Sequence, residues 1–134
     1  MRVLVVGRGG DEPVADGRLD RATVSALADF DGSLARAGIL LAGERLRPTA
    51  EGVRVRGSSR RVAVTDGPPV ETAPITSVWL WQVRSLDEAV EWARRCPLTA
   101  AGGELELRPV AEAVPDPHLG HPRPTAVRGQ ASSS

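Results

Sequence analysis

The chain has 134 residues, the length of one domain of ordinary size, and its 41% hydrophobic residues include so few aromatic ones that valine, leucine and alanine must form most of the core. Its 17 acidic residues balance 17 basic residues, all of them arginine, and this zero net charge argues against a nucleic acid or an acidic membrane as partner. A single cysteine excludes an internal disulfide and no apolar run reaches the length of a membrane span, so we expect a cytoplasmic protein.

The first part of the chain reads as a strand, a loop and a helix. Residues 2–6, RVLVV, are short, β-branched and apolar, which is typical of a strand buried on both faces. Glycine-rich residues 7–17 follow, but Glu12 stands where a dinucleotide-binding fingerprint has its third glycine, so we interpret them as a plain loop. Residues 20–37 have helical periodicity, and Gly38 is placed to end that helix. Its buried stripe is predicted to consist of Val24, Leu27, Ala28, Leu34 and Ala35.

The rest of the chain is predicted to hold a hairpin, two further strands and a second helix. Ser85 and Glu88 have the spacing of a capping box, so a helix begins there, and Pro97 prevents its continuation. The predicted strands are residues 39–48 (a short strand or extended turn), the hairpin 52–57 and 61–65, then 77–83 and 103–110.

This order of elements predicts an α+β fold. Residues 1–110 can be drawn as a ferredoxin-like antiparallel sheet with two helices on one face and an extra strand pair. Residues 111–134 contain scattered prolines and end in three serines, so we expect a flexible tail.

Residues 77–83 have two apolar faces, because side chains alternate along a strand. Trp79 and Trp81 point one way, whereas Val78 and Leu80 point the other. One face meets the helices, and the other, which could carry both indoles, would remain an exposed apolar patch. A second copy packed face to face would cover it, so we expect a homodimer. Alternatively, the two tryptophans line a ligand pocket, which could lie between the two sheets.

Four segments of the chain carry a family resemblance. Residues 37–48 (AGILLAGERLRP), 65–72 (TDGPPVET), 85–97 (SLDEAVEWARRCP) and 104–110 (ELELRPV) resemble, in this order, the motifs of the YCII-related family and of its DGPF-type branch. The resemblance implies a dimeric α+β barrel. Many such proteins have unknown activity, some resemble lyases or dehalogenases that use a His–Asp pair, and DGPF-type proteins are often associated with extracytoplasmic-function sigma factors.

The chain departs from this family pattern at several points, among them Ala73-Pro74 in place of the usual Lys-Glu, and two departures bear on the predicted site. Pro69 replaces the phenylalanine of the motif, and both histidines, His118 and His121, lie in the tail, so no His–Asp pair can form within residues 1–110. The spacing of these histidines suits two metal ligands, but no further ligand accompanies them, and we predict neither a metal nor a cofactor.

The DGPP segment supplies the candidate site. Asp66 and Gly67 favour a turn and the prolines hold it rigid, which suits a pocket wall or a plain connection. Beside the tryptophans, Asp66 or Glu71 would be desolvated; this would raise the pKa of the carboxyl group and suit a general base. Alternatively, Asp66 caps the turn and Glu71 pairs with an arginine such as Arg108.

Two functions follow from these interpretations. The first is a small-molecule-binding homodimer, regulatory in kind and associated with a sigma factor, with a ligand pocket near the DGPP loop lined by Trp79, Trp81 and Arg108. The second is a cofactor-free lyase, isomerase or cyclase acting on a small organic acid or ring compound. In that enzyme Asp66 or Glu71 is the catalytic acid–base and an arginine holds the anion.

Overall fold

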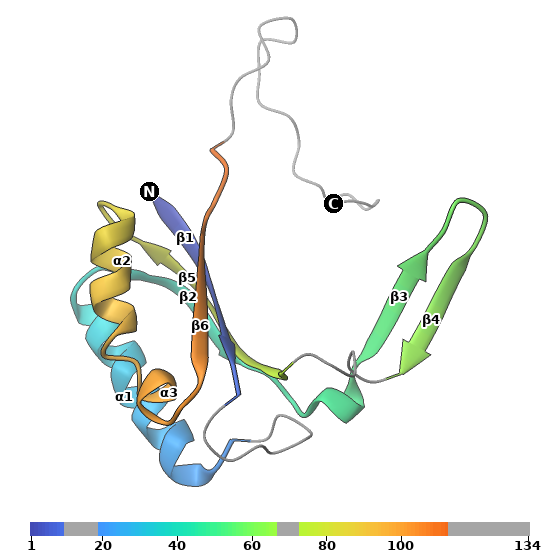
Figure 1. The fold of residues 1–134 in the computed structure, drawn as a ribbon. Helices are drawn as coiled ribbons and strands as arrows, with labels where there is room; N and C mark the ends of the chain where they lie inside the picture. The colour runs from blue at the N-terminus through green and yellow to red at the C-terminus, as the bar shows by residue number, and fades with distance from the viewer. Residues whose placement is uncertain (10–18, 67–72, 113–134) are drawn as a thin grey trace, which may run out of the picture.

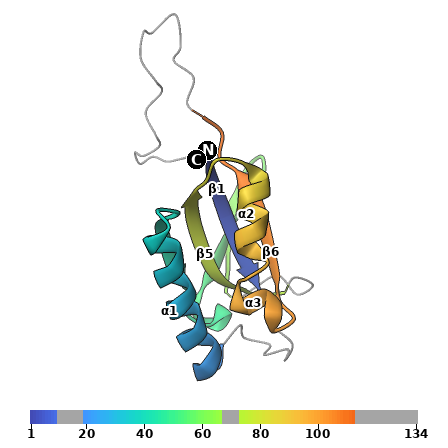
Figure 2. The ribbon, with the colours of Figure 1, turned by 90° about the vertical axis from the view of Figure 1, so that its left-hand side faces the viewer.

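The computed structural model describes residues 1–9, 19–66 and 73–112. Its elements are β1 (Arg2–Arg8), α1 (Arg21–Arg36), β2 (Leu40–Arg45), the short 3-10 helix η1 (Thr49–Glu51), β3 (Val53–Gly57), β4 (Val62–Asp66), β5 (Ile75–Gln82), α2 (Leu86–Ala93), α3 (Pro97–Ala100) and β6 (Glu104–Pro109). Four strands form an antiparallel sheet in the order β2-β5-β1-β6, and α1 and α2 lie across one of its faces (Figure 1, Figure 2). The predicted ferredoxin-like α+β fold is confirmed. Among the described residues, no helix is both long and apolar enough to cross a membrane.

Side-chain caps fix the start of each long helix. Asp20 accepts a hydrogen bond of 2.7 Å from the backbone N–H of Thr23 at the start of α1, and bonds from Thr23 lower the pKa of the Asp20 carboxyl group. Ser85 accepts one of 3.1 Å from the N–H of Glu88 at the start of α2. The Glu88 carboxylate returns to the N–H of Arg84, one residue before the N-cap, at 2.7 Å. The predicted capping box is therefore present in a slightly extended form.

The core lies between the sheet and the helices, and it corrects part of the predicted helix stripe. The buried residues of α1 are Leu27, Phe30 and Leu34, whereas Val24 is 42% exposed. Pro97 also does more than predicted: it ends the second helix but occupies the first turn of α3, where its missing N–H costs nothing. The buried apolar residues are Val3, Val5, Leu27, Phe30, Leu34, Ile39, Trp79, Trp81, Val83, Ala89, Ala93, Cys96 and Leu98.

Both tryptophans of β5 belong to this core. Trp79 and Trp81 are 1% and 0% exposed, and the Phe30 ring meets them edge-on, with centroid distances of 6.3 and 6.2 Å. The alternation predicted for this strand is confirmed. The idea that the indoles occupy the face away from the helices is wrong, because the helix layer takes the larger side chains.

The opposite face of the sheet, here called the open face, carries smaller apolar residues. In the strand register Leu4 pairs with Leu80 and Val6 with Val78, so these four side chains form a square at the centre of the open face. Leu4 is 42% exposed, and the other three are half-buried. The open face is therefore apolar in the monomer, as predicted, although no indole contributes to it.

Strands β3 and β4 form a separate two-stranded sheet, here called the arm (residues 53–66), which confirms the predicted hairpin. The arm extends away from the main body on the side opposite the helices (Figure 1).

Candidate functional site

The glycine-rich segment after β1 and the DGPP segment before β5 connect to the same end of the sheet, because β1 and β5 are antiparallel neighbours. Strand β1 ends at Arg8, and Gly9 then precedes residues 10–18; strand β5 begins at Ile75, which Ala73 and Pro74 separate from residues 67–72. The N–H of Gly9 donates to the carbonyl of Pro74 at 3.0 Å, and the Arg8 guanidinium donates to the carbonyl of Ala73 at 3.3 Å. These bonds hold the ends of the two segments side by side.

Of the predicted catalytic residues, Asp66 directly precedes residues 67–72 and Glu71 is one of them. Asp66 is the last residue of β4 and pairs with Val53, but its side chain is outside the described part of the structure. Glu71 lies outside the described residues altogether. Their roles therefore stay predictions.

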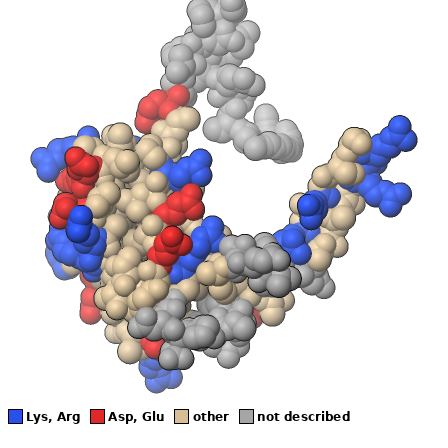
Figure 3. Space-filling view, viewed as in Figure 1, with Lys and Arg blue, Asp and Glu red and all other residues tan. Residues whose placement is uncertain are grey.

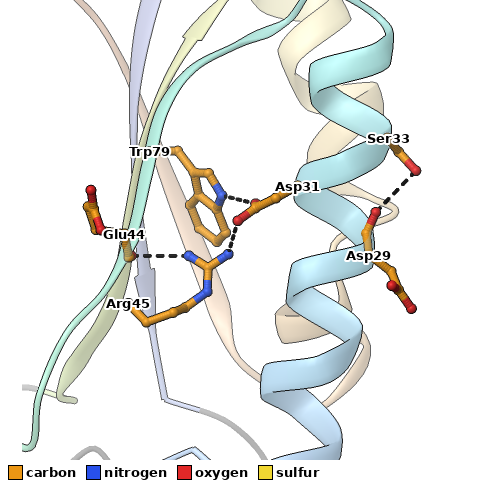
Figure 4. A network of polar contacts seen from close by, with 6 residues as sticks. All are labelled: Asp29, Asp31, Ser33, Glu44, Arg45 and Trp79. Atoms are coloured by element: carbon orange, nitrogen blue, oxygen red, sulfur yellow. Dashed lines mark hydrogen bonds and ion pairs between the residues drawn. The ribbon is translucent and has the colours of Figure 1, made fainter.

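A polar network that the sequence did not reveal lies close to this end of the sheet, between α1 and strands β2 and β5 (Figure 4). The Asp31 carboxylate accepts one hydrogen bond of 2.8 Å from Trp79 Nε1 and another of 2.5 Å from Arg45 Nη2. The Arg45 guanidinium lies 4.9 Å from the centroid of the Trp79 ring, and it also donates to the carbonyl of Glu44 at 3.1 Å. The side chains of Asp31 and Arg45 are 25% and 22% exposed, so the pair is partly desolvated but within reach of solvent.

A glycine in β2 makes this network possible. A Cβ atom on Gly43 would lie 2.8 Å from Trp79 Cδ1, closer than real Cβ contacts come. Gly43 is the register partner of Trp79, so its missing side chain leaves room for the indole to lean over β2. The indole nitrogen then meets Asp31 on α1, and the ring supports the Arg45 guanidinium.

Buried polar groups surround the network on the helix side of the sheet. Ser77 is the register partner of both Arg45 and Gly7, is 0% exposed, and its hydroxyl has no hydrogen-bond partner among the described residues. Cys96 is buried nearby, and desolvation raises the pKa of its thiol, which outweighs bonds from the backbone of α3 and the nearby Arg45 charge that lower it. The thiol is therefore a neutral, inert neighbour, while the Ser77 hydroxyl, without a hydrogen-bond partner in the described part of the chain, belongs to the register partner of Arg45.

A comparison with protein-family models identifies a YCII-related domain over residues 1–113. The chain belongs to the YCII-related family. No curated protein matches it. Among solved structures, one match is 5-chloro-2-hydroxyhydroquinone dehydrochlorinase from Burkholderia phenoliruptrix AC1100 in complex with 2,5-dihydroxybenzoquinone, which is 18% identical, with 79% of this chain and 91% of that chain covered and a TM-score of 0.45. A likeness of this extent carries no information about substrate or activity.

In this YCII-related domain the predicted ligand-binding residues do not come together. Trp79 and Trp81 lie side by side, with ring centroids 6.1 Å apart, but under the helices. Arg108 pairs in register with Leu4 and therefore lies on the open face, where it is 71% exposed and contacts Glu106 at 3.3 Å. The described part of the structure thus connects Trp79 to Arg45 and not to Arg108.

One sequence signal could have revealed the network of this YCII-related domain. Leu27, Phe30, Asp31 and Leu34 follow the spacing i, i+3, i+4, i+7 of a helix face that packs on a core, so Asp31 is a carboxylate on an apolar stripe. A charged group at such a position requires a partner, because an unpaired charge there would be strongly destabilising.

Among the described residues, no group of three His, Cys, Asp or Glu side chains could hold a metal ion.

Proposed function

We propose that this YCII-related domain is a homodimeric, small-molecule-binding protein of the DGPF-type branch, whose ligand is a small organic acid that contacts Arg45. The carrying observation is the Arg45 guanidinium, which Asp31 and the Trp79 ring hold in place at 22% exposure. Of its five N–H groups, two donate to acceptors among the described residues. The remaining donors suit a planar carboxylate or enolate.

The position of Arg45 supports the same proposal. Arg45 ends β2 and pairs in register with Ser77, two residues from Ile75, where the DGPP segment joins β5. A ligand on the guanidinium would therefore lie near the start of β5, the strand that follows the DGPP segment in the chain. Assignment to the DGPF-type branch rests on Asp66-Gly67-Pro68 and on the Ser85 helix start, with Pro69 as the departure.

A binding titration tests this function, because Trp79 touches the guanidinium and reports on it by fluorescence. Benzoate, hydroxybenzoates and short dicarboxylates are titrated into the wild-type chain, into Arg45→Gln and into a matched control, Arg47→Gln. Arg47 lies two residues further on, is 82% exposed and pairs with Glu51. We expect Arg45→Gln to weaken binding about 10- to 100-fold and Arg47→Gln to leave it unchanged. Equal affinity in all three proteins would contradict the proposal.

The same ligands also test the enzymatic alternative. Each ligand that binds is incubated with the protein and followed by mass spectrometry. If the wild type turns a ligand over and Asp66→Asn or Glu71→Gln does not, the domain is an enzyme that uses acid–base catalysis at the DGPP segment. Binding that is unchanged in both variants, without turnover, would leave the domain as a binding module and remove the predicted catalytic role of both acids.

The homodimer is the second part of the proposal. Leu4, Val6, Val78 and Leu80 form a flat apolar centre on the open face, and each lateral end of the row that contains Val6 and Val78 is an acid, Glu106 or Glu44. A two-fold axis through this face would pack the same patch on itself, as in an isologous interface. Sedimentation equilibrium should find a dimer for the wild type. In the variant Leu80→Lys, which buries an unpaired charge at the centre of the face, we expect a monomer.

A further inference from the structure

We propose that the arm reaches across the two-fold axis and packs its valine face against the second copy of the chain. The register of the arm defines this face: Val55 pairs with Val64, Val62 with Gly57, and Val53 with Asp66. Val53, Val55, Val62 and Val64 are 61%, 65%, 67% and 65% exposed. The other face of the arm carries pairs of a different kind, such as Arg56 with Ala63.

A two-stranded arm that packs against nothing is not expected to be stable. Two strands alone are at best marginally stable in water, and they need a third layer or strand to pack against. Four neighbouring valines, each about two-thirds exposed, form an apolar patch on an element whose register contacts are with itself. The alternation of valine with arginine in β3 makes one face of the arm apolar and gives the other face charged side chains.

The position of the arm favours a second copy as its occupant. The arm stands on the side of the sheet opposite α1 and α2, which is the side of the open face (Figure 1). A second copy packed on the open face therefore lies in the direction in which the arm extends. Because a two-fold axis relates the two copies, the arm of the second copy contacts the first copy in the same way. This inference rests on the proposed homodimer and states how that dimer is held.

The extent of the interface supports the same occupant. A stable interface takes about 20–30 residues from each partner. The open face offers roughly every second residue of four strands of 6 to 8 residues, on the order of 12. The valine face of the arm, with alternate residues of two strands of 5 residues each, adds about 5 and brings the total close to that range.

The arm tip and one edge of the open face carry opposite charges. The arm contains four arginines and one acid, Asp66, the last residue of β4, and basic side chains gather at its free end (Figure 3). At the edges of the open face, Glu44 is exposed on β2, whereas Glu106 on β6 already pairs with Arg108 and Arg8. An arginine-bearing arm tip laid along the β2 edge of the partner would meet Glu44 and steer the two copies into register.

Neighbouring residues of β4 provide a matched test. Val64 and Ala63 are both exposed and adjacent, but they lie on opposite faces of the arm, and the chain contains no native lysine. The variants Val64→Lys and Ala63→Lys are compared by sedimentation equilibrium of the full chain, with thermal melting as the check on folding. We expect Val64→Lys to raise the dimer Kd about tenfold or more and Ala63→Lys to change it less than about threefold.

A photo-crosslinking amino acid at position 64 or 63 identifies what covers each face. We expect covalent dimers from position 64 only. An intramolecular product between position 64 and residues 113–134 would overturn the inference, because the chain's own C-terminal segment would then cover the valines. A dimer that Leu80→Lys dissociates but Val64→Lys does not would overturn the role of the arm and leave the proposed homodimer intact. A monomeric wild type would overturn both.

Discussion

Replacement of Asp31 tests whether the network at Arg45 stabilises the fold. The variant Asp31→Ala removes an acceptor from Trp79 Nε1 and from Arg45 Nη2. A hydrogen bond to a charged acceptor contributes about 1.5–3 kcal/mol. The ion pair adds only about 0.5–1 kcal/mol, because side chains that are 22% and 25% exposed are partly screened by solvent. We therefore expect a loss of about 2–4 kcal/mol in the free energy of unfolding.

Urea denaturation followed by circular dichroism measures this loss. At a slope of about 1–3 kcal/mol per molar, the midpoint should fall by about 1–2 M. Asp29→Ala is the matched control, since Asp29 is exposed on the same helix and its replacement gains the same helix propensity. Asp31→Asn keeps an acceptor for Trp79 but loses the charge, so it should fall between the two. Equal midpoints for Asp31→Ala and Asp29→Ala would refute the reasoning.

Three other features give separate predictions. Gly43→Ala forces a Cβ to within 2.8 Å of Trp79 and should cost about 1–3 kcal/mol with a change in Trp fluorescence. Gly52→Ala is the control, because a Cβ there lies at an ordinary contact distance of 3.5 Å from the Thr49 carbonyl oxygen, and it should change the free energy of unfolding far less. Hydrogen bonds from Arg84 lower the pKa of the Glu88 carboxyl group from its ordinary value of 4.5. The stability that Glu88 contributes is therefore present above pH 4.5 and is lost as the pH falls through the lower pKa of the folded protein. Glu88→Gln should flatten this part of the acid-unfolding curve, and an unchanged curve would contradict the prediction. Burial raises the pKa of Cys96, so the folded protein should react with a thiol reagent at pH 8 far more slowly than the urea-unfolded chain, and comparable rates would show that the thiol is accessible.

The sequence carried most of the fold because its local signals agree with the tertiary structure. Alternation identified the strands, and the capping box at Ser85 and Glu88 located the start of α2. Pro97 was harder to interpret, since one residue can end a helix and occupy the first turn of the next. The predicted stripe of α1 included Val24 and missed Phe30. Small apolar residues such as alanine and valine occur on more than one side of this helix, so their spacing alone does not identify the buried side.

The candidate site was less accessible to sequence reasoning. Alternation divides β5 into two faces, but both faces are apolar, so it cannot say which one meets the helices. The volume of Trp79 and Trp81, which fills the layer against Phe30, decides that question only in three dimensions. Asp31 and Arg45 are 14 residues apart in the chain, and only the packing of α1 on β2 brings them together.

Dimerisation is proposed on the open face of the sheet and ligand binding on its helix side, so a single substitution can test whether the two depend on each other. A pocket between the sheets of two copies would need the dimer, whereas Arg45 and Trp79 lie under the helices of one copy. Leu80 and Trp79 are adjacent in β5 but point to opposite faces, so Leu80→Lys should dissolve the dimer and leave ligand affinity at Arg45 unchanged. Binding measured on that monomeric variant therefore distinguishes the two locations. Affinity equal to that of the wild type places the ligand on the helix side, and a parallel loss of dimer and affinity returns it to the space between the two sheets.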